Sequence, residues 1–213
     1  MKILIAVPTY ENIYPDTFKS IYDLDKGGHD TDFRFFRGYD VANARNQIGQ
    51  ATLDGGYDYC LMIDNDVTVP SDALVKLIET EQESKLSRSM VVGYCLTRPV
   101  NANNTDGMTS AFKWGGRDYV RADAYVADEL KALRDSGVKK VQIRGSGLPC
   151  ALVHREVFEK IKYPWFRWIT YDNKTQLSED LYFCEQFNSV MRPIFVDTRV
   201  ACGHLMRHID YVK

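Results

Sequence analysis

The first hundred residues alternate between short strand-like runs and longer segments with helical patterning, and this alternation constrains the fold more than any other feature. We expect strands over residues 2–7, 32–36, 57–63 and 90–96, with helices over residues 13–24, 41–53 and 71–84 between them. A chain that alternates in this way forms a parallel sheet flanked by helices, with right-handed crossovers. The sequence therefore predicts an α/β fold.

The second half of the chain is less regular and predicts a smaller, antiparallel part. Helices are expected over residues 127–134, 155–161 and 178–189, and strands over residues 139–143, 149–153, 193–196 and 199–202. Residues 101–116 are rich in Asn, Thr, Gly and Asp and are expected to form a loop, and long loops are often functional. Because the sequence has no internal repeat, linker or low-complexity segment, we expect one domain over residues 1–213.

The composition excludes several classes of protein. The formal net charge is -2 over 213 residues, so there is no global basic field for non-specific binding of nucleic acid. No apolar segment approaches the roughly 20 residues that span a bilayer. The five cysteines are widely spaced and form no C-x-x-C pair, which indicates reduced, buried thiols rather than disulfides or a zinc site. These features predict a cytoplasmic protein.

The strongest local signal is Asp64-Asn65-Asp66, which directly follows a predicted buried strand. In open α/β sheets, ligands bind outside the carboxyl ends of the strands. Carboxylates one residue apart on a turn can meet one hard divalent cation. Asp and Asn are also common turn formers and helix caps, so the triplet is informative because of its place after a strand and before a new helix.

Two further candidate motifs for binding a nucleotide lie upstream. Pro8-Thr9-Tyr10-Glu11 follows the first strand, where nucleotide-binding α/β folds contact a base or a ribose. Arg45 lies in a predicted helix and can pair with a phosphate or hold an acidic loop, although an arginine on a helix is usually solvated. The sequence has no G-x-G-x-x-G and no G-K-[ST], which counts against a Rossmann-type dinucleotide site and a P-loop.

Candidate acid–base and metal-binding residues also occur in the last third of the chain. Ser178-Glu179-Asp180 begins a predicted helix, where Ser178 can cap and acids suit the helix dipole, or one acid can act as a general base. Neighbouring helical residues do not share a face, so at most one of the two acids takes that role. His204 follows a strand, and imidazole suits Mn²⁺ and similar ions. The aromatic-rich residues 163–171 are either core or a platform for a sugar ring.

In their order along the chain, these motifs resemble the GT-A-type glycosyltransferases, particularly the family-2-like nucleotide-sugar enzymes. The matching motifs are Val7-Pro8-Thr9-Tyr10-Glu11, Ala44-Arg45-Asn46, Asp64-Asn65-Asp66, Gly145-Ser146-Gly147, Glu179-Asp180 and His204. The Ala-Arg-Asn and D-x-D arrangement is also similar to that of the retaining mannosyltransferases of the fungal Anp1 type. The resemblance therefore leaves open whether the sugar's anomeric configuration is inverted or retained.

This resemblance implies a fold, an activity and a set of roles. The fold would be a GT-A-like, mostly parallel sheet in which residues 1–100 bind a nucleotide-sugar and residues 101–213 bind the acceptor. The activity would be hexosyl transfer from a nucleotide-sugar, more often a UDP-sugar than a GDP-sugar, to an acceptor hydroxyl, with Mn²⁺ or Mg²⁺ as cofactor. The nucleotide would be bound by Pro8, Thr9, Tyr10, Glu11, Arg45, Asp64 and Asn65, and the metal ion by Asp64, Asp66 and His204. Asp180 or Glu179 would deprotonate the acceptor, residues 145–147 would border it, and residues 101–116 would close over the site.

Two other classes of protein stay open at this point. A nucleotidyltransferase usually presents a Gly- and Arg-rich loop with a lysine after its first strand, and residues 8–11 contain none of these. A non-catalytic module that binds nucleotides or carbohydrates is the other alternative, and the carboxylates and His204 argue against it. The cluster Arg34, Arg37 and Arg45 leaves room for an anionic acceptor. The acceptor itself, which could be a glycan, a lipid-linked sugar, a protein or a modified nucleic-acid base, is not specified by the sequence.

Overall fold

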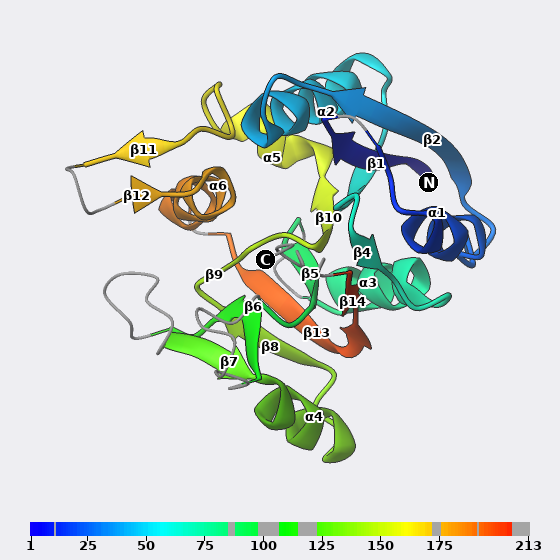
Figure 1. Cartoon of the computed structure of the whole chain (residues 1–213), viewed down its shortest axis with the longest axis vertical. Coiled ribbons are helices and arrows are strands. Elements are labelled where there is room, and N and C mark those ends of the chain that lie inside the picture. The colour runs from blue at the N-terminus through cyan, green and yellow to red at the C-terminus, as the bar shows by residue number, and fades with distance from the viewer. Residues whose placement is uncertain are drawn as a thin grey trace, which may run out of the picture.

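The computed structural model describes residues 1–10, 12–84, 88–97, 107–114, 123–171, 176–190 and 192–205. Its centre is a seven-stranded sheet in the order β2-β1-β3-β10-β5-β13-β8 (Figure 1). The strands are β1 (Lys2–Thr9), β2 (Asp30–Arg37), β3 (Tyr59–Ile63), β5 (Met90–Tyr94), β8 (Lys140–Ile143), β10 (Cys150–His154) and β13 (Ile194–Ala201). All of them run parallel except β10 and β8, which are antiparallel to their neighbours. The predicted α/β fold with a mostly parallel sheet is confirmed.

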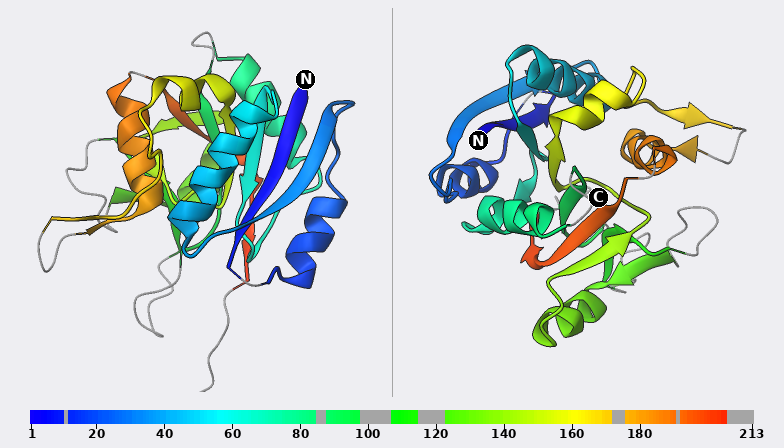
Figure 2. Two further views of the ribbon diagram at one scale, coloured as in Figure 1. Left: turned by 90° about the horizontal axis from the view of Figure 1, so that it is seen from above. Right: turned by 180° about the vertical axis from the view of Figure 1, so that it is seen from behind.

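Helices cover both faces of this sheet (Figure 1). They are α1 (Pro15–Tyr22), α2 (Val41–Asp54), α3 (Ala73–Gln82), α4 (Ala127–Asp135), α5 (Arg155–Lys160) and α6 (Glu179–Ser189). One core cluster contains buried side chains of α2, α5 and α6, and the other contains those of α1 and α3. Figure 2 shows the same division from behind, with α2, α5 and α6 on one side of the strands and α1 and α3 on the other.

The burial of both faces explains why the central strands are almost continuously apolar. In β1, Leu4 and Ala6 pack into the cluster with α2, whereas Ile3, Ile5 and Val7 pack into the cluster with α1 and α3. Successive side chains of a strand point to opposite faces, so a strand covered on both faces needs apolar residues at every position. Pro8 does not end β1 as the sequence suggested, because β1 continues beside β2 as far as Thr9.

Three small antiparallel sheets complete the described structure. One joins β6 (Met108–Phe112) to β7 (Ala124–Val126) and β9 (Gly145–Ser146), and another joins β11 (Ile169–Thr170) to β12 (Gln176–Leu177). The third pairs β4 (Val67–Thr68) with β14 (Gly203–His204). This last pairing matters for the site, because it brings the end of the described chain back to the segment after β3.

Three predictions for the second half are wrong in detail. Strand β6 occupies part of the expected loop over residues 101–116. Residues 101–106 and 115–116 of that expected loop lie outside the described residues. The buried polar residues of β6 concealed its strand character, since Thr109 bonds the carbonyl of Tyr125 at 2.9 Å instead of reaching water. The two glycines of Gly145-Ser146-Gly147 predict a turn, whereas residues 145–146 form β9. Residues 193–196 and 199–202 do not form separate strands, because β13 passes through both beside β5.

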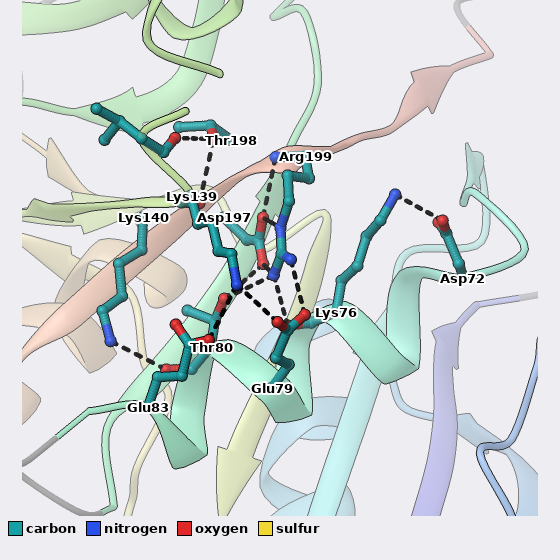
Figure 3. A network of polar contacts seen from close by, with 11 residues as sticks. Asp72, Lys76, Glu79, Thr80, Glu83, Lys139, Lys140, Asp197, Thr198 and Arg199 are labelled. Carbon is teal, nitrogen blue, oxygen red and sulfur yellow. Dashed lines mark hydrogen bonds and ion pairs between the residues drawn. The ribbon is translucent and has the colours of Figure 1, made fainter. Parts of the chain in front are cut away.

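A polar network outside the apolar core attaches α3 to β13 (Figure 3). Arg199 donates to both carboxylate oxygens of the fully buried Asp197, at 3.0 and 2.8 Å, and to Glu79 at 2.7 Å. Thr80 donates to Asp197 at 2.7 Å, so the buried carboxylate has several donors. A buried charge is tolerated when it is paired and hydrogen-bonded in this way.

The thiols agree with a further expectation. All five cysteines are unpaired, four of them are buried, and Cys202 is partly buried. Within the described residues, no helix has the length and the apolar character needed to cross a membrane.

Candidate functional site

A cavity of about 420 Å³ opens where β1 and β3 end. These strands are parallel neighbours, so Thr9 and Asp64 emerge at the same edge of the sheet. The cavity is lined by Pro8, Thr9, Tyr10, Asp40, Val41, Arg45, Asp64, Asn65, Asp66, Gly147, Trp168, Ser178, Glu179 and Asp180. A smaller cavity of about 170 Å³ shares Asp64 and Gly147 with the first and is also lined by His204. Most of the residues singled out in the sequence therefore surround one connected region.

Arg45 is the buried cation of this region. Helix α2 begins where Asp40 accepts a hydrogen bond from the backbone N–H of Asn43 at 2.7 Å, a capping role that Asp commonly takes. One turn later, Arg45 points into the cavity with 3% of its side chain exposed. Its Nη2 donates to Asp64 at 2.7 Å, and its Nη1 pairs with Glu179. Of the two kinds of partner that the sequence left open, phosphate or acid, Arg45 here holds acids.

The third guanidinium nitrogen of Arg45, Nε, differs from the other two in its hydrogen bonding. Arg45 Nε is buried and, among the described residues, none accepts a hydrogen bond from it. A buried donor without an acceptor carries a desolvation cost of about 1–3 kcal/mol. Such an orphaned donor in the wall of a cavity is satisfied when a ligand or water oxygen binds beside it.

The carboxylates around Arg45 change one another's protonation. Burial raises the pKa of Glu179 to about 7, and the charge of Asp180 adds to this although Arg45 opposes it. Burial likewise raises the pKa of Asp64 against the effect of Arg45. Although burial alone would lower the pKa of Arg45, the attraction of Asp64, Glu179 and Asp180 raises it. Arg45 therefore stays charged, while Glu179 and Asp64 hold protons more tightly than carboxylates in water.

Asp180 and Glu179 are neighbours in the chain but lie in different surroundings. Glu179 is buried against Arg45, with 5% of its side chain exposed. Asp180 is only partly buried, and its Oδ1 accepts from Ser178 Oγ and from the backbone N–H of Leu181. Its Oδ2 faces Gly147, since a Cβ built on that glycine would lie 3.5 Å from it. Asp180 is therefore the acid of the pair that a substrate in the cavity can reach.

Asp66 and His204 meet through the pairing of β4 with β14. The backbone N–H of Leu205 donates to the carbonyl of Asp66 at 2.8 Å, and His204 Nε2 lies 3.5 Å from Asp66 Oδ2. His204 Nδ1 lies 2.9 Å from the carbonyl oxygen of Leu96. The contact with Asp66, followed by that with Cys95, raises the pKa of His204 to about 10.

The chemistry of this pair suits a divalent cation. A histidine that binds a metal usually donates its other ring N–H to a carbonyl or carboxylate, as His204 Nδ1 can toward Leu96. Mg²⁺ is commonly held by one or two protein ligands and completed by substrate phosphates and waters. Across the described residues, however, no group of three or more His, Cys, Asp or Glu side chains gathers closely enough to hold a metal. Asp64, the third expected ligand, is turned toward Arg45.

The remaining predicted site residues are placed as follows. Pro8 and the exposed Tyr10 line the cavity. Thr9 and Asn65 also line it, but their side chains bond the carbonyl of Asn12 at 2.8 and 2.7 Å and so order the loop after β1. Glu11 lies outside the described residues.

Four lining residues were not predicted as part of the site. Asp40 and Ser178 lie at helix starts, where Asp and Ser are common caps, and Val41 gave no signal. Trp168 belongs to the aromatic-rich segment for which both a core and a binding role were open, and 52% of it is exposed at the cavity. Its place in an aromatic run, without helical or strand periodicity, was the available signal.

Fold and site together describe a GT-A-like α/β protein, with the cavity at the carboxyl edge of its parallel strands. No protein family matches the sequence, and no curated protein is similar to it in sequence. Similarity is found at the level of structure. The fold of A197 from STIV matches with a TM-score of 0.62 and 17% identity, over 100% of this chain and 98% of that chain.

A second solved structure with this fold is that of GalNAc-T7 with UDP, GalNAc and Mn²⁺. It matches with a TM-score of 0.64 and 10% identity, over 98% of this chain and 44% of that chain. The present chain thus spans less than half of the length of that protein. At these identities the comparisons establish the shared fold.

Proposed function

We propose that this protein is a metal-dependent glycosyltransferase that moves a hexosyl group from a nucleotide-sugar, preferably a UDP-sugar, to an acceptor hydroxyl. The observation that carries the proposal is the gathering of Arg45, Asp66 and Asp180 around one cavity at the carboxyl edge of the sheet. His204 lies beside Asp66 and lines the smaller cavity that adjoins it. The solved structure of GalNAc-T7, which contains UDP, GalNAc and Mn²⁺, supports the donor class and the metal.

The two halves of the chain would bind different substrates. Residues 1–100 supply Pro8, Thr9, Tyr10, Asp64 and Asn65 to the cavity, and these residues would bind the nucleotide. Residues 101–213 supply Gly147, Glu179 and Asp180, and this half would hold the acceptor. The orphaned Arg45 Nε would donate to an oxygen of the diphosphate or of a bound water.

In the reaction, Asp180 would accept the proton of the acceptor hydroxyl through Oδ2. The hydroxyl oxygen forms the new bond to the anomeric carbon, the bond from that carbon to the diphosphate oxygen breaks, and the nucleoside diphosphate leaves with the bonding electrons. Glu179 would act on Arg45 rather than on the substrate, because it is buried against the guanidinium. This assignment describes the inverting course, in which base and leaving group lie on opposite sides of the sugar.

Asp66 and His204 would hold Mn²⁺ or Mg²⁺, with Asp64 near them. The ion would neutralise charge that develops on the departing diphosphate. Because proton and metal compete for His204 Nε2, binding of the ion would release the proton that His204 shares with Asp66. The unpaired thiols suit a reducing compartment such as the cytoplasm, where we place the activity.

Thermal unfolding with a panel of nucleoside diphosphates, each with and without Mn²⁺, tests this proposal. A ligand at about 100 times its dissociation constant adds about 2.7 kcal/mol to the free energy of unfolding. We expect UDP to raise the melting temperature with Mn²⁺ and much less without it, and Asp66→Asn to abolish the effect of the metal. If no nucleoside diphosphate raises the melting temperature under either condition, the proposal is wrong. A shift without any turnover of nucleotide-sugars would favour a non-catalytic binding module instead.

A further inference from the structure

Trp168 is a conspicuous side chain of the cavity, and the proposed reaction does not use it. It lines the same cavity as Glu179 and Asp180, and 52% of its surface is exposed. Among the described residues, no aromatic ring stacks on it, whereas the nearby Trp165 is buried and packs edge-on against Phe158. A large flat apolar face held open beside a candidate base is a surface that a ligand can cover.

The segment that precedes Trp168 is fixed by Asn46. The Oδ1 atom of Asn46 accepts from the backbone N–H groups of Trp165 and Phe166 at 3.0 and 3.1 Å, and its Nδ2 donates to the carbonyl of Phe166 at 2.7 Å. All three bonds are buried, so they hold the backbone two residues before Trp168 against α2.

Two further contacts make this support rigid. Trp165 Nε1 lies 3.0 Å from the carbonyl oxygens of both Phe158 and Ile161. The ring of Phe166 stacks on that of Phe183 in α6, with centroids 4.3 Å apart. Helix α2 therefore holds the acidic residues through Arg45 and the aromatic segment through the next residue, Asn46. A preorganised aromatic surface loses little entropy when a ligand stacks on it.

The charge around the cavity indicates which kind of ligand would cover the face of Trp168. Among the described residues, the lining contains the carboxylates of Asp40, Asp64, Asp66, Glu179 and Asp180 but a single cation, Arg45. Arg34 and Arg37, which the sequence suggested for an anionic acceptor, do not line it, and Arg34 instead donates to Tyr57 at 2.8 Å. Such a surface repels a second anion, so a phosphorylated, acidic or nucleic-acid acceptor is disfavoured.

We propose that Trp168, positioned by Asn46, is a stacking platform for an uncharged sugar ring of the acceptor. The C–H groups on one face of such a ring lie on the indole, and the hydroxyl to be modified points toward Asp180. This inference rests on the proposed function and narrows its acceptor to a neutral saccharide.

The test is a titration with neutral oligosaccharides (maltotriose, cellotriose, lactose and mannotriose) in the presence of UDP and Mn²⁺, measured by isothermal titration calorimetry. Digalacturonic acid serves as the charged comparator. Trp114→Ala is the matched control, because 53% of Trp114 is exposed and it does not line the cavity. We expect saturable binding of at least one neutral saccharide to wild type and to Trp114→Ala, and weaker binding of the charged comparator. Trp168→Ala should lose about tenfold in affinity and Trp168→Tyr about threefold or less.

The melting shift caused by UDP separates this inference from the proposed function. If Trp168→Ala keeps the UDP shift and loses saccharide binding, the platform is supported. If Trp168→Ala loses the UDP shift, the indole stacks on the nucleobase and the inference is wrong. It is equally wrong if no neutral saccharide binds wild type, or if Trp168→Ala binds it unchanged, while UDP still stabilises. Saccharide binding that depends on Trp168 in a protein that no nucleotide stabilises would keep the platform and refute the transferase.

Discussion

At the scale of single residues, the candidate site depends most on Arg45. Its guanidinium is almost fully buried and joins Asp64, which follows β3, to Glu179, which begins α6. These partners come from distant parts of the chain, since Glu179 is 134 positions away. Breaking a buried ion pair by removing one partner is strongly destabilising because the other charge is left without compensation.

The first prediction concerns this pair. Arg45→Met should lower the free energy of unfolding by about 3–5 kcal/mol, measured by urea denaturation. The double variant Arg45→Met with Glu179→Gln should be less destabilised than the sum of the two single variants, because Glu179 then leaves no buried carboxylate without its cation and only Asp64 stays unpaired. Additive effects of the two substitutions would contradict the pairing.

Single residues also show how much of the site a local sequence motif can predict. Asp64-Asn65-Asp66 and His204 were predicted because each follows a strand, and the pairing of β4 with β14 does bring His204 to Asp66. That Arg45 can hold an acidic loop was predicted, and Asp64 is such a partner. Its pairing with Glu179 and the bonds of Asn46 were not predicted, because nothing in a helical segment specifies which distant side chain it will meet. Whether these residues bind a nucleotide and a metal stays a prediction.

At the scale of elements, α2 packs its small residues against the aromatic segment. Gly49 lies where a Cβ would be 2.8 Å from Trp165 Cε3 and 3.0 Å from Phe158 Cδ1. Both rings belong to the buried core cluster that contains α2 and α6. The helix can approach this closely because residue 49 has no side chain.

The second prediction follows from this contact. Gly49→Ala should destabilise the protein, since overpacking costs about 1–3 kcal/mol and exceeds the gain in helix propensity of roughly 1 kcal/mol. Gln50→Ala, on the exposed side of the same helix, should stay within about 0.5 kcal/mol of wild type. Urea denaturation of both variants measures the difference, and a stabilised Gly49→Ala variant would contradict the packing described for α2.

The third prediction concerns the attachment of α3 to β13 and uses pH (Figure 3). Hydrogen bonds from Lys139 and Arg199 lower the pKa of Glu79 from its ordinary 4.5 to about 2. A carboxylate with a lowered pKa in the folded protein contributes stability above its unfolded pKa and loses it as the pH falls. The contribution of Glu79 should therefore be complete above about pH 4.5 and disappear toward pH 2.

Glu79→Gln should remove this part of the acid sensitivity. The side chain of Glu79 is 41% exposed, so we expect an effect of about 1 kcal/mol or less. Glu83→Gln is the matched control, because Glu83 pairs with the same Lys139, at 3.0 Å. Among the described residues, its ion pair does not include Arg199. Equal loss of stability between pH 5 and pH 2 in wild type and Glu79→Gln would refute this role of Glu79.

Elements that bury apolar residues at a regular period were predicted well, and those held by polar contacts were not. Strands β1, β3 and β5 and helices α2 and α3 lie close to their expected positions because their apolar patterns match the two core clusters. Strand β6 was missed because buried Thr109 and Ser110 satisfy their hydroxyls inside the protein, which the composition of the segment does not reveal.

At the scale of the whole molecule, all five cysteines have free thiols, and four of them are buried. The fourth prediction is that a thiol-reactive dye titrates five thiols in denaturant without reductant. In the native protein, the four buried cysteines should react slowly, because burial protects them from the reagent. Reductant should leave the melting temperature unchanged. Fewer than five thiols in unreduced, denatured protein would reveal a disulfide and contradict the structure.

The whole account rests on one cavity that receives a nucleotide-sugar from the first half of the chain and an acceptor from the second. The most direct test is the release of nucleoside diphosphate from a panel of UDP- and GDP-sugars with Mn²⁺ and neutral oligosaccharides, in wild type and in Asp180→Asn. We predict release from at least one UDP-sugar by wild type, and a rate lower by about 100-fold or more in Asp180→Asn, as expected for loss of a general base. Equal rates in the two proteins, or no release by wild type from any donor, would contradict the account.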